Sequence, residues 1–145
     1  FISSTFWTER IGPTAALKTL EVMEREKSWD VITTIGTSLK ESWTKLALNH
    51  NLKIKLNGIP SLASFSFESK NSLEYKTIIT QEMLKKGFLA STTCYVCIEH
   101  KAEIMTKYLT ALDEVFSLIR KCEDGLPLEK ILEGPVCHKR FNRLN

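Results

Sequence analysis

The feature that most constrains the fold is a pair of short alternating segments enclosed by longer segments with helical spacing. In the pair, apolar residues stand at every second position and alternate mainly with lysines or serines: Leu52, Ile54 and Leu56, then Ala63, Phe65 and Phe67. Such alternation is typical of strands with one apolar face, and the break at 57–60 predicts an antiparallel hairpin. Both strands therefore need one layer of helices to cover that face.

Helical spacing marks the segments on both sides of the hairpin. We predict helices over residues 9–27, 28–50 and 72–86 and a fourth from about Ile104 to Gly125, with a short helix over 128–132. Residues 88–91 are predicted as a short strand, and residues 92–99 as its extension or a loop. The order predicts an α+β fold: a two-layer sandwich in which a small, mostly antiparallel sheet of three to four strands packs against helices, with a long N-terminal helix.

Single residues refine these elements. Ser28 is expected to cap the second helix, Gly36 to mark a close packing contact, and Gly87 to end the third helix in a left-handed conformation. The residues expected to point inward are Leu73, Ile78, Ile79, Met83 and Leu84 in the third helix, and Ile104, Tyr108, Leu112, Val115, Phe116 and Ile119 in the fourth.

Length and composition indicate one domain over residues 1–145, with a tail over 134–145. A net charge of +3 is too small to indicate nucleic acid or a membrane surface as a partner, and no apolar run reaches the ~20 residues of a membrane span. Four cysteines do not suggest a disulfide framework, so a reducing cytoplasm is expected. The first residue is Phe, and the chain reads as a C-terminal fragment of a longer protein.

Hydroxyl side chains precede the first helix, in the stretch Ser3-Ser4-Thr5-Phe6-Trp7-Thr8. Thr8 is a plausible cap, and Pro13 fits in a first helical turn. Hydroxyls and free amides ahead of a helix N-terminus can bind an anion, although most such starts only cap a helix. Ala16, Leu17, Leu20 and Met23 then share one helix face.

Residues 5–20 resemble the segment that opens the small C-terminal domain of class III, fold-type I, pyridoxal-phosphate (PLP) aminotransferases, especially the glutamate-1-semialdehyde aminomutase-like group. Thr5 falls on the family's phosphate-binding Thr, and Ala15, Ala16, Leu17, Thr19 and Leu20 fall on its Ala-rich helix. The family's Ser-Gly-Asn-Pro is replaced here by residues 7–10, and the resemblance extends to residues 132–138. It implies that Thr5, with Ser4, binds the cofactor phosphate of the neighbouring subunit in a homodimer.

The resemblance also implies what this chain lacks. The family's cofactor-anchoring lysine and the Asp that pairs with the pyridine nitrogen lie upstream of Thr5, and no lysine here matches the former. We therefore expect no catalytic residue in this chain, which would be inactive alone and would act with its own large PLP-binding domain on an amino donor and acceptor. Residues 88–97 contain no Arg, the residue with which several class III relatives bind the substrate carboxylate.

Two other classes of protein compete with this interpretation. One is a non-enzymatic α+β binding or assembly module, in which Thr5 is no more than a cap. The other is a zinc or thiol-redox domain built on Cys94 and Cys97 with His100, and with Cys137 and His138 later in the chain. A single Cys-x-x-Cys is a weak zinc signal, because structural zinc sites use four converging ligands, and we expect no metal.

Overall fold

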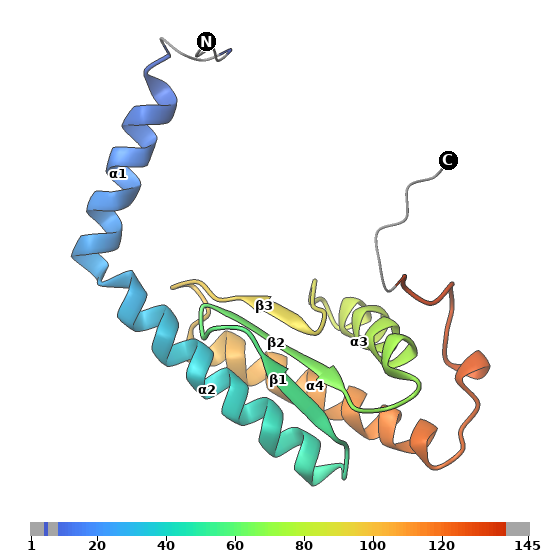
Figure 1. The fold of residues 1–145 in the computed structure, drawn as a ribbon. Coiled ribbons are helices and arrows are strands. Elements are labelled where there is room, and N and C mark those ends of the chain that lie inside the picture. Colours follow the sequence, from blue (N-terminus) through green and yellow to red (C-terminus); the bar gives the residue numbers. More distant parts are fainter. Residues whose placement is uncertain (1–4, 6–8, 139–145) are drawn as a thin grey trace.

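The computed structural model describes Thr5 and residues 9–138. Its elements follow in the order α1 (Ile11–Glu26), α2 (Ser28–Asn49), β1 (Ile54–Asn57), β2 (Leu62–Phe67), α3 (Ser72–Lys85), β3 (Thr93–Tyr95) and α4 (Ala102–Glu123). A 3₁₀ turn, Leu128–Lys130, stands where the short last helix is predicted (Figure 1). The predicted α+β class is confirmed, since the described residues form four helices and one small antiparallel sheet.

The sheet has three strands in the order β1-β2-β3, and both pairs are antiparallel. The predicted hairpin pairs Ile54 with Phe67 and Leu56 with Phe65. Ala63, Phe65 and Phe67 are buried on one face of β2, as their alternation requires. Helices α2, α3 and α4 cover that face, so the core lies between one sheet and one layer of helices (Figure 1).

The centre of the core is aromatic. Trp43 of α2, Phe65 of β2 and Phe116 of α4 meet edge to face, with ring centroids 4.8 and 5.9 Å from that of Phe65. Phe67 connects this cluster to Tyr75 of α3 at 5.4 Å. Edge-to-face pairs add roughly 0.5–1.5 kcal/mol each to the burial of the rings. These contacts join three helices to the central strand.

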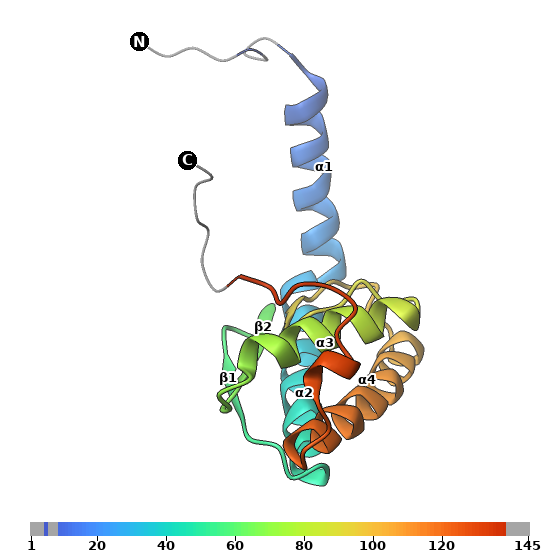
Figure 2. The same ribbon diagram turned by 90° about the vertical axis from the view of Figure 1, so that its right-hand side faces the viewer.

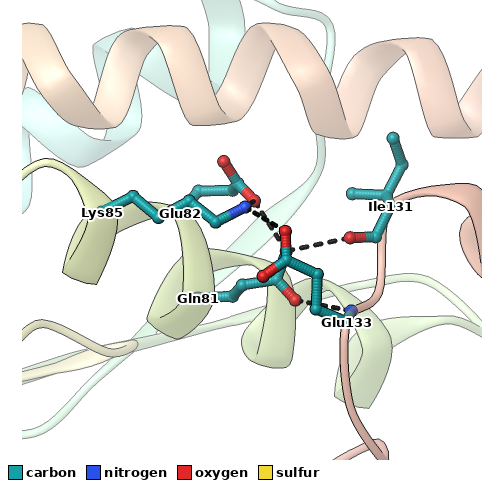
Figure 3. A network of polar contacts seen from close by, with 5 residues as sticks. All are labelled: Gln81, Glu82, Lys85, Ile131 and Glu133. Carbon is teal, nitrogen blue, oxygen red and sulfur yellow. Dashed lines mark hydrogen bonds and ion pairs between the residues drawn. The ribbon is translucent and has the colours of Figure 1, made fainter.

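A strap from the C-terminal part of the chain, residues 128–138, lies along α3. Gln81 holds it at two points: its Nε2 donates to the carbonyl oxygen of Ile131 at 2.9 Å, and its Oε1 accepts from the N–H of Glu133 at 2.9 Å. Figure 3 shows this pair beside the ammonium of Lys85, which lies 2.6 Å from Glu133 and 2.7 Å from Glu82. The N–H of Cys137 donates to Thr77 at 3.0 Å. Side chains of α3 therefore form hydrogen bonds with the backbone of the strap at three positions.

Helix α1 extends away from the rest of the molecule as an arm (Figures 1 and 2). None of its residues is buried. Leu17, Leu20 and Met23, from the face that the sequence marks as apolar, are 70%, 61% and 39% exposed. The helix is thus amphipathic in sequence without a partner for that face among the described residues.

The predicted strand over residues 88–91 is wrong, because β3 lies at Thr93–Tyr95. Gly87 adopts a positive φ of 84° after α3, as predicted, and the N–H of Phe88 bonds the carbonyl of Met83 at 2.9 Å. The N–H of Phe88 therefore completes the end of α3 and does not pair with a neighbouring strand. Pairing with β2 begins only when the carbonyl of Thr92 accepts from the N–H of Phe65.

The prediction that Ser28 caps the second helix is also wrong. Lys27, with φ 47° and ψ 48°, is the single residue between α1 and α2, and Ser28 is already the first residue of α2. The hydroxyl of Ser28 is buried and has no hydrogen-bond partner among the described residues. Two further inward assignments are wrong as well, since Leu84 is 56% and Ile104 45% exposed.

Gly36 does mark a close contact, with the hairpin loop. A Cβ placed on this residue would lie 2.0 Å from the carbonyl oxygen of Pro60 and 2.5 Å from its carbon. Only a residue without a side chain lets the loop between β1 and β2 sit this close to α2. Glycine costs a helix about 1 kcal/mol relative to alanine, but here it allows the hairpin to pack against α2.

Candidate functional site

The residues around the start of α1 form the first candidate site. Thr5 is exposed and lies six positions before Ile11, the first residue of the helix, while Ser4, Thr8 and Trp7 lie outside the described residues. Arg10 is the residue before the first turn and makes no side-chain capping bond. Glu9 takes that role, because its Oε1 and Oε2 accept from the N–H of Gly12 at 2.7 and 3.1 Å.

This geometry divides the candidate anion site into two parts. The helix N-terminus, where partial positive charge favours an anion, is already served by the carboxylate of Glu9. An incoming phosphate at this point would meet a negative side chain. Among the residues described, the carboxylate of Glu9 bonds the N–H of Gly12, so the prediction that Thr5 binds a phosphate rests on its own hydroxyl and not on the amides of the first turn.

A second candidate is a pocket of about 310 Å³ between the segment after α3 and the start of α4. Its lining includes Cys94, His100 and Tyr108 among apolar side chains. Burial raises the pKa of the Cys94 thiol, and burial likewise raises the pKa of Tyr108, although the hydrogen bond from Trp43 lowers it. Both groups therefore stay protonated and neutral near pH 7. The Nδ1 atom of His100 accepts from the N–H of Cys97 at 3.3 Å, which uses one ring nitrogen in a local turn.

This pocket was not found from the sequence. Its walls come from residues 88–95 and from one side of α4, and only the tertiary structure brings these segments together. The alternating and helical patterns report which residues are apolar, not which elements leave a gap between them. In the sequence, His100 and the cysteines stand out only for the chemistry of their side chains.

The cysteines named for a zinc or thiol-redox domain lie in different surroundings. Among the residues that the structure describes, no group of three or more His, Cys, Asp or Glu side chains is placed to hold a metal ion. Cys94 ends up half-buried, Cys97 exposed and Cys137 against α3, where its Sγ lies 3.6 Å from the carbonyl oxygen of Leu73. In the same described part of the chain, no helix combines the length and apolar character that crossing a bilayer requires.

No protein-family model matches the sequence, but a curated protein and a solved structure do. The chain is 24% identical over 126 residues to the 3-aminobutyryl-CoA aminotransferase of Cloacimonas acidaminovorans (strain Evry). That alignment covers 83% of this chain and 30% of the relative. This chain thus spans under a third of the length of the curated relative.

A solved structure provides the second comparison. The PLP internal aldimine form of the FumI protein of Sphingopyxis sp. MTA144 superposes with a TM-score of 0.75 over 90% of this chain and 32% of that one, at 19% sequence identity. At this identity the match establishes the shared fold. In sequence, this chain is therefore similar to part of an aminotransferase, and it has the fold of part of a protein solved in its PLP internal aldimine form, as the resemblance of residues 5–20 predicts.

Proposed function

We propose that this chain is the small C-terminal domain of a PLP-dependent aminotransferase or aminomutase. The observation that carries the proposal is the agreement of two independent comparisons. One finds sequence similarity to an aminotransferase and the other finds the fold in a PLP-bound protein, and in both this chain spans about a third of the relative. In the longer protein the domain covers one side of the active-site cleft.

PLP, when bound, acts as an electron sink that stabilises the carbanion formed at the substrate's Cα. This chain's part is to hold the cofactor of the neighbouring subunit by its phosphate. Thr5, with Ser4, supplies the hydroxyl donors, at ~1.5–3 kcal/mol for each charge-assisted hydrogen bond. The exposure of Thr5 at the free end of the α1 arm supports this role, because a donor must be accessible to reach another subunit.

The partners follow from the same proposal. A phosphate bound across a subunit boundary requires a homodimer, and each subunit also needs its own large domain to anchor the cofactor through a lysine. The exposed face of α1, formed by Leu17, Leu20 and Met23, supports an extensive contact with the longer protein, because apolar side chains gathered on one helix face favour burial. The chain by itself is then inactive.

The type of reaction, the substrate and the compartment are proposed from particular residues. Replacement of the family's Ser-Gly-Asn-Pro by residues 7–10 favours an aminotransferase over a strict aminomutase of the glutamate-1-semialdehyde type, although the chain resembles that group. The absence of Arg from residues 88–97 favours a substrate whose carboxylate is bound elsewhere. Four free thiols in the described part of the chain agree with a reducing cytoplasm.

The test is the affinity of the longer, dimeric protein for PLP, measured by equilibrium titration of the purified apoprotein. Thr5→Ala removes the hydroxyl and is expected to weaken binding about 10- to 100-fold, the equivalent of one charge-assisted hydrogen bond. Thr5→Ser keeps the donor and is expected to bind within about threefold of the parent. Thr14→Ala, on an exposed position of α1, is the matched control.

Two outcomes separate the role of Thr5 from the function of the protein. Unchanged affinity in Thr5→Ala would show that this residue does not hold the phosphate, while leaving the enzyme class in place. A longer protein that binds no PLP at all would contradict the enzyme class and favour the alternative, a non-enzymatic binding or assembly module.

A further inference from the structure

The pocket between residues 88–95 and the start of α4 has no part in the proposed function. Its volume of about 310 Å³ is at the lower end of the range of small-molecule sites, ~300–1,000 Å³. Apolar surface predominates on its wall, from residues such as Phe88, Ile104 and Met105, and none of the described residues that line it is Asp, Glu, Lys or Arg. A charged ligand would lose hydration there without gaining a counter-charge. The lining therefore favours an uncharged ligand.

Tyr108 supplies a hydrogen-bond donor to this pocket. The residue lines the pocket, and its Oη accepts from the indole N–H of Trp43 at 3.1 Å. Phe88 contacts its ring edge to face, with the ring centroids 5.9 Å apart. Burial raises the pKa of the hydroxyl by more than the bond from Trp43 lowers it, and Cys94, which also lines the pocket, raises it further. The hydroxyl therefore keeps its hydrogen near pH 7 and lies close to Cys94.

The hydrogen of this hydroxyl is available to a ligand. Within the described part of the chain, the Tyr108 hydroxyl accepts one hydrogen bond and donates none. A hydroxyl that accepts from an N–H is polarised by it and becomes a stronger donor. An acceptor oxygen on a ligand would therefore complete a chain of hydrogen bonds that runs from Trp43 through Tyr108 to the ligand.

His100 adds a second donor without adding charge. Its Nδ1 accepts from the N–H of Cys97 at 3.3 Å, so the ring hydrogen is on Nε2. In this tautomer the imidazole is neutral and its Nε2–H can donate. Ile104 lies midway in sequence between His100 and Tyr108, one helical turn before Tyr108. The pocket thus offers two uncharged donors with an apolar side chain between them.

We propose that this pocket binds a small uncharged carbonyl compound, such as a ketone, an ester or an amide. The carbonyl oxygen accepts from the hydroxyl of Tyr108, and the apolar part of the ligand packs against Ile104 and Met105. A carbonyl oxygen is the matching group because it accepts hydrogen bonds and carries no charge. The site needs only described residues of this chain, so it depends neither on PLP nor on the proposed enzymatic role.

The experiment measures the binding of methyl pentanoate to the 145-residue chain by nuclear magnetic resonance, with the methionine methyl groups and the indole N–H groups labelled. Met105 lines the pocket, Met83 is fully buried in the core and Met23 lies on α1, so their signals distinguish three parts of the molecule. Titration to about 30 mM is expected to shift the signals of Met105 and of the Trp43 indole, with a Kd of about 1–10 mM for a ligand of this size. The signal of Met23 is expected to stay in place.

Two comparisons test the chemistry of the site. Hexanoate has the same numbers of carbon and oxygen atoms but carries a charge, and it is expected to bind at least about 10-fold more weakly. Tyr108→Phe keeps the ring and removes the donor, and it is expected to weaken the binding of methyl pentanoate about 2- to 10-fold. Thr110→Ala, at an exposed position of α4 that bonds only within the helix, is the matched control and is expected to bind like the parent.

The Met83 signal verifies that each variant keeps its folded core. An unshifted Met105 signal, a shift of Met23 in its place, equal affinity for hexanoate, unchanged affinity in Tyr108→Phe, or loss of binding in Thr110→Ala would each overturn the proposal. Each of these outcomes leaves the proposed function in place, because no cofactor or second subunit takes part in the measurement.

Discussion

At the scale of the residue, single atoms decide how the layers meet. The missing Cβ of Gly36 lets the carbonyl of Pro60 rest against α2, and the indole N–H of Trp43 donates to the hydroxyl of Tyr108 at 3.1 Å across the core. The first contact joins the hairpin to α2, and the second joins α2 to α4. Neither residue can be replaced by a similar one without loss of the contact. Position 36 has no space for a Cβ, and position 43 needs an N–H donor at the distance of the indole nitrogen.

Gly36→Ala is expected to destabilise the protein, although alanine is the better helix former by about 1 kcal/mol. The new methyl group would lie 2.0 Å from a backbone oxygen, so the hairpin loop must move. Overpacking of this kind lowers the free energy of unfolding by ~1–3 kcal/mol. Urea denaturation followed by circular dichroism measures the change. Gly134→Ala, where an added Cβ meets nothing within 4 Å, is the control and should leave the midpoint unchanged.

Glu82 gives a pH dependence with a defined sign. Burial raises the pKa of its carboxyl, but hydrogen bonds from Lys85 and Gln81 more than offset this, and the net pKa lies below the ordinary 4.5. A carboxyl with a depressed folded-state pKa stabilises the fold above about pH 4.5, and this contribution disappears as the pH falls through the folded-state pKa. The stability difference between the parent and Glu82→Gln, from urea titrations at about pH 6 and pH 3, should therefore shrink in acid. A difference that is the same at both pH values would contradict this assignment.

At the scale of the element, α3 has two roles: it packs against the core and it binds the strap. Its buried residues Tyr75, Ile78, Ile79 and Met83 pack inward, while Thr77, Gln81 and Lys85, on another side, bind the strap of residues 128–138. The strap has little regular structure of its own, a single 3₁₀ turn, so side chains must satisfy its backbone groups. Helix α3 thus holds in place a segment that lies about 50 residues further along the sequence.

Gln81→Leu removes both hydrogen bonds to the strap and is expected to loosen it selectively. Each bond is worth ~0.5–1.5 kcal/mol, so the free energy of unfolding should fall by ~1–3 kcal/mol. Hydrogen exchange measured by mass spectrometry should become faster across residues 131–137 and stay the same in β2. Thr80→Ala, an exposed neighbour that bonds only within α3, serves as the control. Faster exchange throughout the domain would show that Gln81 supports the core and not the strap.

At the scale of the whole molecule, the chain divides into a core and an arm. The buried residues lie in α2, α3, α4, the sheet and the loops beside it, and none lies in α1. The stability of the core is therefore expected to be independent of the arm. The apolar surface of α1 adds little to the stability of this fold, because apolar surface stabilises a protein when it is buried and no residue of α1 is.

Deletion of residues 1–20 is expected to leave the free energy of unfolding within about 1 kcal/mol of the parent, measured at a concentration low enough for both to be monomers. Every described residue removed is exposed or contacts its own helix. A truncated chain that unfolds much more readily would mean that α1 belongs to the folding unit.

The sequence alone determined the class of fold and most of the elements. Strict alternation at 52–56 and 63–67 leaves one solution, a hairpin with one buried face, and Gly87 and Gly125 end helices at the positive φ values that only glycine adopts readily. It also determined the resemblance to aminotransferases, which the comparisons confirm. These are local or pattern properties, and each depends on residues close together in the chain.

The tertiary structure alone decided which apolar faces are covered. Leu20 of α1 and Leu112 of α4 look equally apolar in sequence, yet the first is 61% exposed and the second fully buried. The start of β3 and the two hydrogen bonds from Gln81 to the strap also depend on which distant segments meet. Hydrophobic periodicity indicates that a face favours burial, but the partner that buries it is set by packing among all the elements.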